Sequence, residues 1–172
     1  MSLLLLRATP HVHIYYDQNN DWLFIEWQGL LDLRAAQLGC LELTQVRRQH
    51  FCRRALSSSA QVTTTGWDVS AWLAREFLPY LKLVGIEQVA WVSGRSPRGH
   101  QVAHDLLNRL PPLAIVFFDD VEMAVDWLQR HHLCPSAVPV RSAATEAMLQ
   151  HAVRAFTRRV LGAALHEFVP AL

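Results

Sequence analysis

From residue 52 to residue 132 the chain alternates runs typical of strands with segments of helical periodicity, and this alternation constrains the fold most. Strands are predicted for residues 52–62, 87–93 and 113–118. Helices are predicted to begin near Trp67, at Ser96 and at Asp119. Strands that alternate with helices predict parallel pairing with right-handed crossovers. The sequence therefore favours an α/β fold with a parallel sheet over this region.

The first fifty residues predict a different kind of pairing. Residues 11–16 and 22–27 are β-branched and aromatic runs joined by turn formers, which is typical of an antiparallel hairpin. Asp32 is placed to cap a helix whose apolar residues recur at three- and four-residue steps up to Val46. We therefore expect a mixed sheet of about five strands, an N-terminal antiparallel hairpin followed by parallel β-α units, with helices packed on it.

Two helix boundaries can be predicted in more detail. The helix that begins near Trp67 has Asp68 as its expected cap and contains Pro79, which should kink or split it. Asp119 stands three residues before Glu122, close to a capping box, and is the expected start of the helix through Trp127.

After residue 133 the pattern of the sequence changes. Residues 134–142 contain Pro135 and Pro139 without periodicity and are interpreted as a linker, so residues 1–133 form the expected α/β domain. Residues 143–172 predict a long C-terminal amphipathic helix, with Phe156 and Val160 among its apolar positions. Its apolar stripe must be buried on its own domain, on a partner subunit or, as a minority interpretation, at a membrane surface.

Composition limits the classes of function. Lys and Arg number 16 against 15 Asp and Glu, so the net charge of +1 provides no large footprint for nucleic acid or an anionic membrane. The three cysteines form no Cys-x-x-Cys pair, which is consistent with reduced thiols in the cytoplasm. The leucine run at residues 3–6 is too short for a secretory leader, and no stretch approaches the roughly 20 apolar residues of a membrane span. We therefore expect a cytoplasmic protein.

Three groups of residues are candidates for binding a ligand or partner. A Ser/Thr-rich loop is expected at 57–66, where hydroxyls could bind a phosphate, accept phosphorylation or satisfy their own backbone. Two arginines after a strand could hold an anion at a helix start, or lie in solvent. Three tryptophans could line an apolar pocket or fill the core. The candidates are Ser57, Ser58, Ser59, Thr63, Thr64, Thr65, Arg95, Arg98, Trp67, Trp72 and Trp91.

Catalytic and metal-binding motifs are weak. Residues 94–101 have the glycine spacing of a P-loop but carry His100 and Gln101 where Lys and Ser or Thr are required. The chain has no Gly-x-Ser-x-Gly elbow. Histidine pairs at 11 and 13 and at 100 and 104 would bind zinc only if the fold joined them. We therefore predict no catalytic residue, no metal and no cofactor, and keep a hydrolase as the third hypothesis.

Several short segments resemble a known group of small bacterial proteins that are similar to the STAS domain, the fold of anti-sigma-factor antagonists. The resemblance covers residues 11–132 and leaves out the C-terminal helix. The residues that carry it are the opening hairpin, Gly66-Trp67, Trp72, Leu78-Pro79, Gly85-Ile86, Ala90-Trp91-Val92 and the segment 117–128, which reads Phe-Phe-Asp-Asp-Val-Glu-x-Ala-x-x-Trp-Leu. Most of these are core and capping residues, so they indicate fold more than activity.

The resemblance implies a regulatory or binding module without catalysis. In that family the loop after the third strand is the working site, and antagonists carry Asp-Ser-x-Gly there, whose serine a partner kinase phosphorylates. The matching segment here, 57–66, lacks the aspartate and has no Ser-x-Gly, with Thr64-Thr65-Gly66 as the nearest approach. This departure leaves open whether the segment is phosphorylated.

Two functional hypotheses follow from the sequence. The first is a non-catalytic STAS-type regulatory module that binds a protein partner through residues 57–66 and forms a homodimer through its C-terminal helix. The alternative is a sensor or carrier of a small anionic molecule, with the tryptophans around a pocket and Arg95 and Arg98 holding the anion.

Overall fold

A computed structural model of the protein describes residues 2–83, 85–93, 114–131 and 143–166. The chain divides into two compact units, Met1–His132 and Leu133–Leu172. Each unit is described by itself below. The predicted linker at 134–142 lies outside the described residues.

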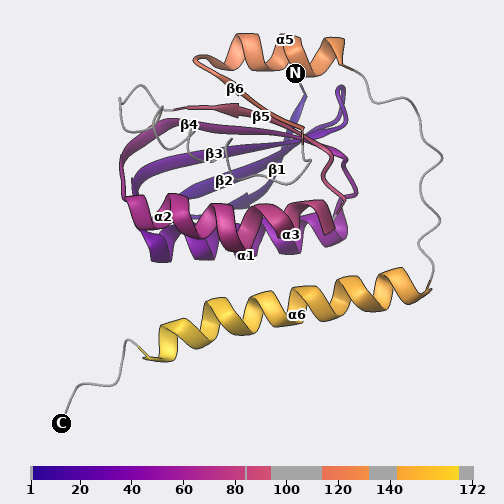
Figure 1. The fold of residues 1–172 in the computed structure, drawn as a ribbon. Coiled ribbons are helices and arrows are strands. Elements are labelled where there is room, and N and C mark those ends of the chain that lie inside the picture. Colours follow the sequence, from indigo (N-terminus) through magenta and orange to yellow (C-terminus); the bar gives the residue numbers. More distant parts are fainter. Residues whose placement is uncertain (1, 84, 94–113, 132–142, 167–172) are drawn as a thin grey trace. The chain divides into compact units, whose positions relative to one another are not determined.

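The first unit is built on a six-stranded mixed sheet with the strand order β1-β2-β3-β4-β5-β6 (Figure 1). β1 to β3 pair antiparallel, and β3 to β6 pair parallel. The prediction of a mixed α/β sheet is confirmed, with six strands in place of about five. The strands are β1 Leu3–Ala8, β2 Val12–Asp17, β3 Trp22–Leu31, β4 Arg54–Thr65, β5 Gln88–Val92 and β6 Ala114–Phe118.

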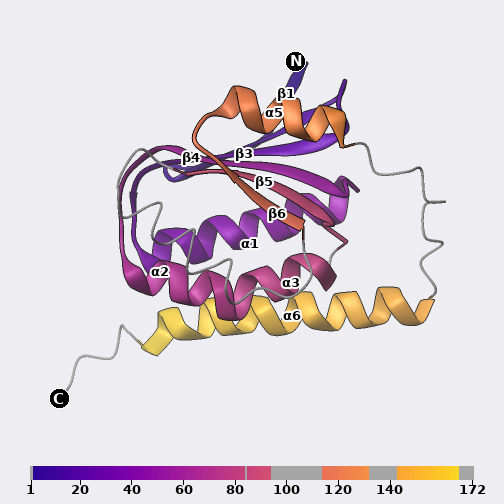
Figure 2. The same cartoon turned by 45° about the horizontal axis from the view of Figure 1, so that its top comes forward.

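Helices cover both faces of this sheet. α1, α2 and α3 lie along one face, and α5 lies on the opposite face (Figures 1 and 2). On the α5 side, fully buried Trp22, Leu56 and Leu128 belong to one apolar cluster. The helices of this unit are α1 Leu33–Gln49, α2 Trp67–Trp72, a π-helical segment Leu73–Phe77, α3 Leu78–Leu83 and α5 Val121–Arg130.

The additional strand, β1, comes from the leucine run that the sequence offered only as a short leader-like segment. It pairs with β2 from Leu3 opposite Asp17 to Ala8 opposite His13, with a register shift between Leu5 and Arg7. Its first three leucines are 41–51% exposed. A run without alternation, exposed at one end of a sheet, does not have the period-2 pattern by which a half-buried strand is recognised.

The predicted hairpin is confirmed, and Asp17 holds its turn. This carboxylate is fully buried and accepts hydrogen bonds from the Asn19 backbone N–H at 3.1 Å and the Asn20 amide at 2.8 Å. Asp21 completes the turn with a positive φ of 54°, a conformation that Asp and Asn adopt more readily than most residues. A buried carboxylate is tolerated here because the turn supplies its hydrogen-bond donors.

The helix starts agree with the sequence at α1 and differ at α2 and α5, and the helix predicted to begin at Ser96 lies outside the described residues. Asp32 caps α1, since its carboxylate accepts from the Ala35 N–H at 2.7 Å. α2 instead has Gly66 as its N-cap without a side-chain bond, and Asp68 lies in the first turn, where its charge suits the helix dipole. α5 is capped by Asp120, one residue after the expected Asp119.

Pro79 divides the expected long helix by way of a π-helical segment. Five residues, Leu73–Phe77, adopt the π form between α2 and α3, and Pro79 is the second residue of α3. Proline has no N–H to donate back along the helix, so the regular α-helical hydrogen bonds are interrupted before it. The π form is rare and is found mostly as a local interruption of this kind within α-helices. The prediction of a kink or split is therefore confirmed.

In the second unit, the structure describes one helix, α6, which runs from Ala143 to His166. Phe156 and Val160 stand four residues apart and thus share one side of this helix. The division of the chain into domain, linker and C-terminal helix stays a prediction.

Candidate functional site

β3 and β4 continue well beyond the end of β5. Pairing between β4 and β5 stops at Ser58 opposite Val92, whereas pairing between β3 and β4 continues to Leu31 opposite Thr65. The segment 57–66, expected as a loop, is therefore strand up to Thr65, and this part of the prediction was wrong. We call the paired residues 28–31 and 61–65 the β3–β4 extension.

The hydroxyl side chains of this segment divide into two groups by burial. Ser57 and Ser58 are 6% and 2% exposed, and Ser57 Oγ accepts a hydrogen bond from the Trp27 indole N–H at 3.2 Å. Thr63 and Thr64 are exposed, while Ser59 and Thr65 are half-buried. The two buried serines therefore serve the core, and the two exposed threonines present their hydroxyls to the surface.

Two large apolar side chains are exposed, one in the extension and one at the start of α2 directly after it. Leu30 pairs with Thr64 across the strands and is 55% exposed, and Trp67 follows directly after Gly66 with 62% exposure. The register shifts between Gly29 and Leu30, where Gly29 takes a φ of 70° that suits glycine. We call Leu30, Thr63, Thr64 and Trp67 the extension surface.

The three predicted tryptophans are not brought together. Trp91 lines the apolar cavity described below and stacks on Phe117 with 5.8 Å between ring centroids. Trp67 is exposed, and Trp72 stacks on Phe77 with 6.2 Å between ring centroids. Neither of these two tryptophans is among the described residues of the cavity wall. Trp27, which sequence reasoning did not select, lines the cavity instead.

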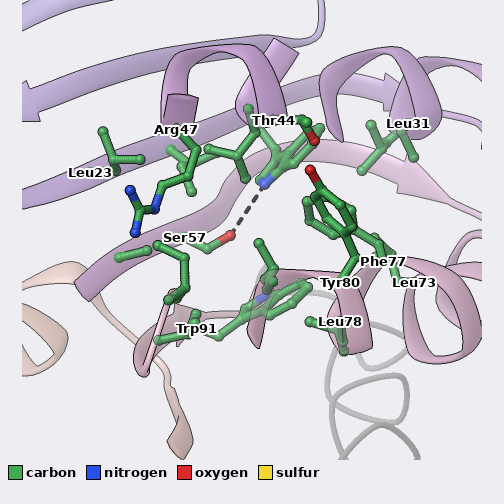
Figure 3. A pocket seen from close by; sticks show the side chains of 18 residues that line it. Leu23, Leu31, Thr44, Arg47, Ser57, Leu73, Phe77, Leu78, Tyr80 and Trp91 are labelled. Carbon is green, nitrogen blue, oxygen red and sulfur yellow. Dashed lines mark hydrogen bonds between the residues drawn. The ribbon is translucent and has the colours of Figure 1, made fainter. Parts of the chain in front are cut away.

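The cavity lies between the sheet and the helices α1 and α3, with a volume of about 50 Å³ (Figure 3). For comparison, an engineered apolar cavity that binds benzene measures about 150 Å³. Its polar lining groups come from Thr44, Arg47, Ser57 and Tyr80, together with the Trp27 indole. The remaining described wall is made by Leu23, Ile25, Leu31, Ala36, Leu43, Ala55, Leu73, Phe77, Leu78, Leu81, Ile86, Val89 and Trp91.

The two described cysteines, Cys40 and Cys52, are free and buried. Burial raises the pKa of the Cys40 thiol well above its ordinary value. Burial also raises the pKa of Cys52 to about 12, with a smaller contribution from Asp21, against the opposing effect of Arg47 and Arg54. Both thiols are therefore protonated at neutral pH, and a protonated thiol is a poor nucleophile.

The other sequence candidates give little further chemistry. Arg95, Arg98, His100 and His104 lie outside the described residues. His13 contacts the Gln28 amide at 3.2 Å between nitrogens and lies next to Tyr15 in β2. Within the described ranges, no group of three or more His, Cys, Asp or Glu side chains is arranged to hold a metal ion.

Comparison with known proteins finds similarity among solved structures. One is an uncharacterized protein of the DUF3478 family with a SpoIIAA-like fold from Shewanella loihica PV-4, at 19% identity and a TM-score of 0.48, covering 72% of this chain and 98% of that one. Another is the anti-sigma factor antagonist SpoIIAA in its unphosphorylated form, at 13% identity and a TM-score of 0.47, covering 76% and 100%. No family model and no curated protein matches this chain. None of the described helices has the length and hydropathy needed to cross a membrane.

Proposed function

We propose that this chain is a non-catalytic regulatory module of STAS type that binds a partner protein through the extension surface. The observation that carries the proposal is the exposure of Leu30, at 55%, on a strand that continues beyond β5, and of Trp67, at 62%, two residues after the end of β4. Tryptophan is enriched among the residues that dominate protein–protein affinity. Large apolar side chains grouped on a surface are typical of interaction sites.

The hydroxyls of the same surface give a route to regulation. A phosphate on Thr64 would add about −1.5 to −2 charge next to Leu30, its neighbour across the strands. Ser57 and Ser58 are too buried to receive a phosphate without opening the sheet. Any phosphorylation of this segment is therefore expected at Thr63 or Thr64. A phosphate on Thr64, which pairs with Leu30 across the strands, would weaken an apolar contact made by Leu30.

Self-association of the chain is a separate hypothesis from the binding of a different partner protein. The hypothesis of a homodimer through the C-terminal helix comes from the sequence and stays a prediction. The alternative, a sensor or carrier with a small anion held by Arg95 and Arg98, also stays a prediction, since both arginines lie outside the described residues.

The partner surface can be tested with Trp67→Ala and Thr64→Asp. The partner would be recovered with the full chain from its own host, identified by mass spectrometry, purified, and titrated against each variant by calorimetry. Because truncation of an aromatic hot spot costs 2 kcal/mol or more, we expect Trp67→Ala to weaken binding by about 30-fold. Thr64→Asp should weaken binding as well, since it places a charge in the contact.

Met123→Ala provides a matched control. Met123 is 59% exposed but belongs to α5, on the opposite face of the sheet (Figure 2). This variant should bind the partner like the wild type. If Trp67→Ala and Met123→Ala bind with the same affinity as the wild type, the extension surface is not the contact and the proposal is wrong.

A further inference from the structure

β1 is the first strand of the sheet, and its first half has neither a charge nor a proline to protect that edge. Among the described strands, β2 alone pairs with it. Natural edge strands are usually protected by charged side chains, proline, a bulge or a covering element. In β1 the register shift lies between Leu5 and Arg7, and Arg7 Nε is paired with Glu42 Oε2 at 3.4 Å. Both devices therefore stand in the second half of the strand.

The leucines of the first half are exposed on both faces of the sheet. Successive side chains of a strand point to opposite faces, so Leu4 lies on one face and Leu3 and Leu5 lie on the other. Leu4 is 46% exposed, and Leu3 and Leu5 are 41% and 51% exposed. An exposed apolar strand at the edge of a sheet is a template for pairing with another strand.

The hydrogen bonds to β2 determine which backbone groups of β1 point outward. The Gln18 N–H donates to the Ser2 carbonyl at 3.1 Å, so these two residues form a hydrogen-bonded pair. Such pairs alternate with non-hydrogen-bonded pairs along an antiparallel ladder. Leu4 therefore bonds to β2, whereas the N–H and C=O groups of Leu3 and Leu5 point away from β2, toward the edge of the sheet.

We propose that two copies of this chain pair antiparallel through β1, with the two-fold axis at Leu4. In this register the outward groups of Leu3 in one copy meet those of Leu5 in the other, and each such pair exchanges both of its N–H···O bonds. Leu4 then faces its own copy on one side of the sheet, and Leu3 faces Leu5 on the other. Each leucine of this segment gains a leucine as its neighbour.

The same segment favours a second copy over an unlike strand. Residues 2–6 carry no charged side chain, so two identical strands do not repel each other across the axis. The outward groups are placed symmetrically about Leu4, so one strand supplies both halves of the contact. A two-fold contact uses the same edge of both copies and closes at the dimer. This contact uses no residue of the extension surface and none of α6.

The first test is the oligomeric state of the full chain, followed by sedimentation velocity up to about 1 mM, because a short edge contact predicts a weak dimer. Leu4→Lys places like charges directly opposite each other at the axis and should weaken dimerisation by at least about 10-fold. Leu38→Lys, at a leucine of α1 that is 40% exposed, is the matched control and should dimerise like the wild type. Far-ultraviolet circular dichroism checks that both variants are folded.

Cysteine substitutions test the register without adding charge. Leu4 faces its copy in a non-hydrogen-bonded pair, where Cα atoms are about 4.5 Å apart, within the span of a disulfide. Leu4→Cys should therefore join two copies under mild oxidation. The two Leu3 positions lie diagonally, about 7–8 Å apart, which is too far for a disulfide. Leu3→Cys should thus give no more covalent dimer than the wild type, which carries the same natural cysteines.

Three results would overturn the proposal. The first is a chain that stays monomeric at about 1 mM. The second is a dimer that Leu4→Lys leaves unchanged; if Leu161→Lys, at a leucine of α6 that is 44% exposed, dissociates it, the contact belongs to the C-terminal helix. The third is equal disulfide formation by Leu3→Cys and Leu4→Cys, which excludes the register. Trp67→Ala should dimerise normally, so a failure here leaves the partner-binding proposal untouched.

Discussion

Gly39 lies where α1 crosses the Trp27 ring. A Cβ at this position would stand 2.4 Å from Trp27 Cζ3 and 3.2 Å from Val12 Cγ1. The Trp27 ring is held by its hydrogen bond to Ser57 and is 6% exposed, so it has little freedom to move away. The glycine is required for the close approach of the helix to the sheet, and not for its backbone conformation.

Gly39→Ala is therefore expected to destabilise the protein, although alanine is the better helix former by about 1 kcal/mol. Overpacking of this kind typically costs about 1–3 kcal/mol in the free energy of unfolding. Urea titration followed by tryptophan fluorescence measures the change. Gly162→Ala is the matched control, since a Cβ there meets nothing within 4 Å, and it should leave stability unchanged or increase it. A Gly39→Ala variant as stable as the wild type would contradict the argument.

At single residues, sequence reasoning identified the cap of α1, missed the caps of α2 and α5, and gave no sign of contacts of this kind. Asp32 was predicted correctly because a capping bond is local, joining it to Ala35 three residues later. Trp27, Gly39 and Arg47 gave no comparable signal, since each acquires its role from residues distant in the sequence. Of the three tryptophans considered for a pocket, Trp91 lines the cavity, and Trp67 and Trp72 are not among its described lining residues.

At the scale of elements, Arg54 joins three parts of the first unit. From β4 its Nη1 donates to the Leu128 carbonyl of α5 at 3.0 Å, and its Nη2 donates to the Asn20 carbonyl in the turn between β2 and β3. Its guanidinium also lies 5.4 Å from the centre of the Trp22 ring. The side chain of Arg54 therefore connects the β2–β3 turn, strand β4 and helix α5.

We expect Arg54→Met to lower the free energy of unfolding by about 1.5–3 kcal/mol, the usual worth of a hydrogen bond to a charged group. The amides of α5 should exchange their hydrogens faster as well. Arg53→Met is the adjacent control: it removes an exposed pair with Glu87, whose Oε1 lies 2.7 Å from Arg53 Nε, and should cost less than about 1 kcal/mol. Equal losses for the two variants in urea unfolding would show that Arg54 does not join these elements as described.

The extension explains why one element was assigned wrongly from the sequence. Serine and threonine are common in loops, and the segment 57–66 was interpreted on that basis. Yet Val62, Thr63, Thr64 and Thr65 are all β-branched, which favours a strand. The decisive factor is the length of β3, which continues to Leu31 and supplies a partner for β4 beyond the end of β5.

For the whole molecule, the alternation of strands and helices was enough to predict the class of fold. Every predicted strand is present. Residues 113–118 form a continuous apolar run and residues 87–93 alternate, and both patterns are typical of strands. β1 was missed because its run of four leucines is short and lacks the period-2 pattern of a half-buried strand, so it was interpreted as a leader-like segment. The cavity and the arginine in its wall could not be predicted, because they depend on how α1 and α3 pack against the sheet.

The predicted domain boundary gives the last test at this scale. The buried cluster that includes Trp22, Leu56 and Leu128 comes entirely from residues 22–128 of the first unit. Residues 1–133 alone should therefore fold, with a single cooperative transition by near-ultraviolet circular dichroism and a midpoint within about 5 °C of the full chain, a difference of roughly 1 kcal/mol. Residues 1–118 should lose this transition, because they lack α5 and the fully buried Leu128. A 1–133 fragment without cooperative unfolding would show that the C-terminal unit is part of the folding unit, and the boundary at 133 would be wrong.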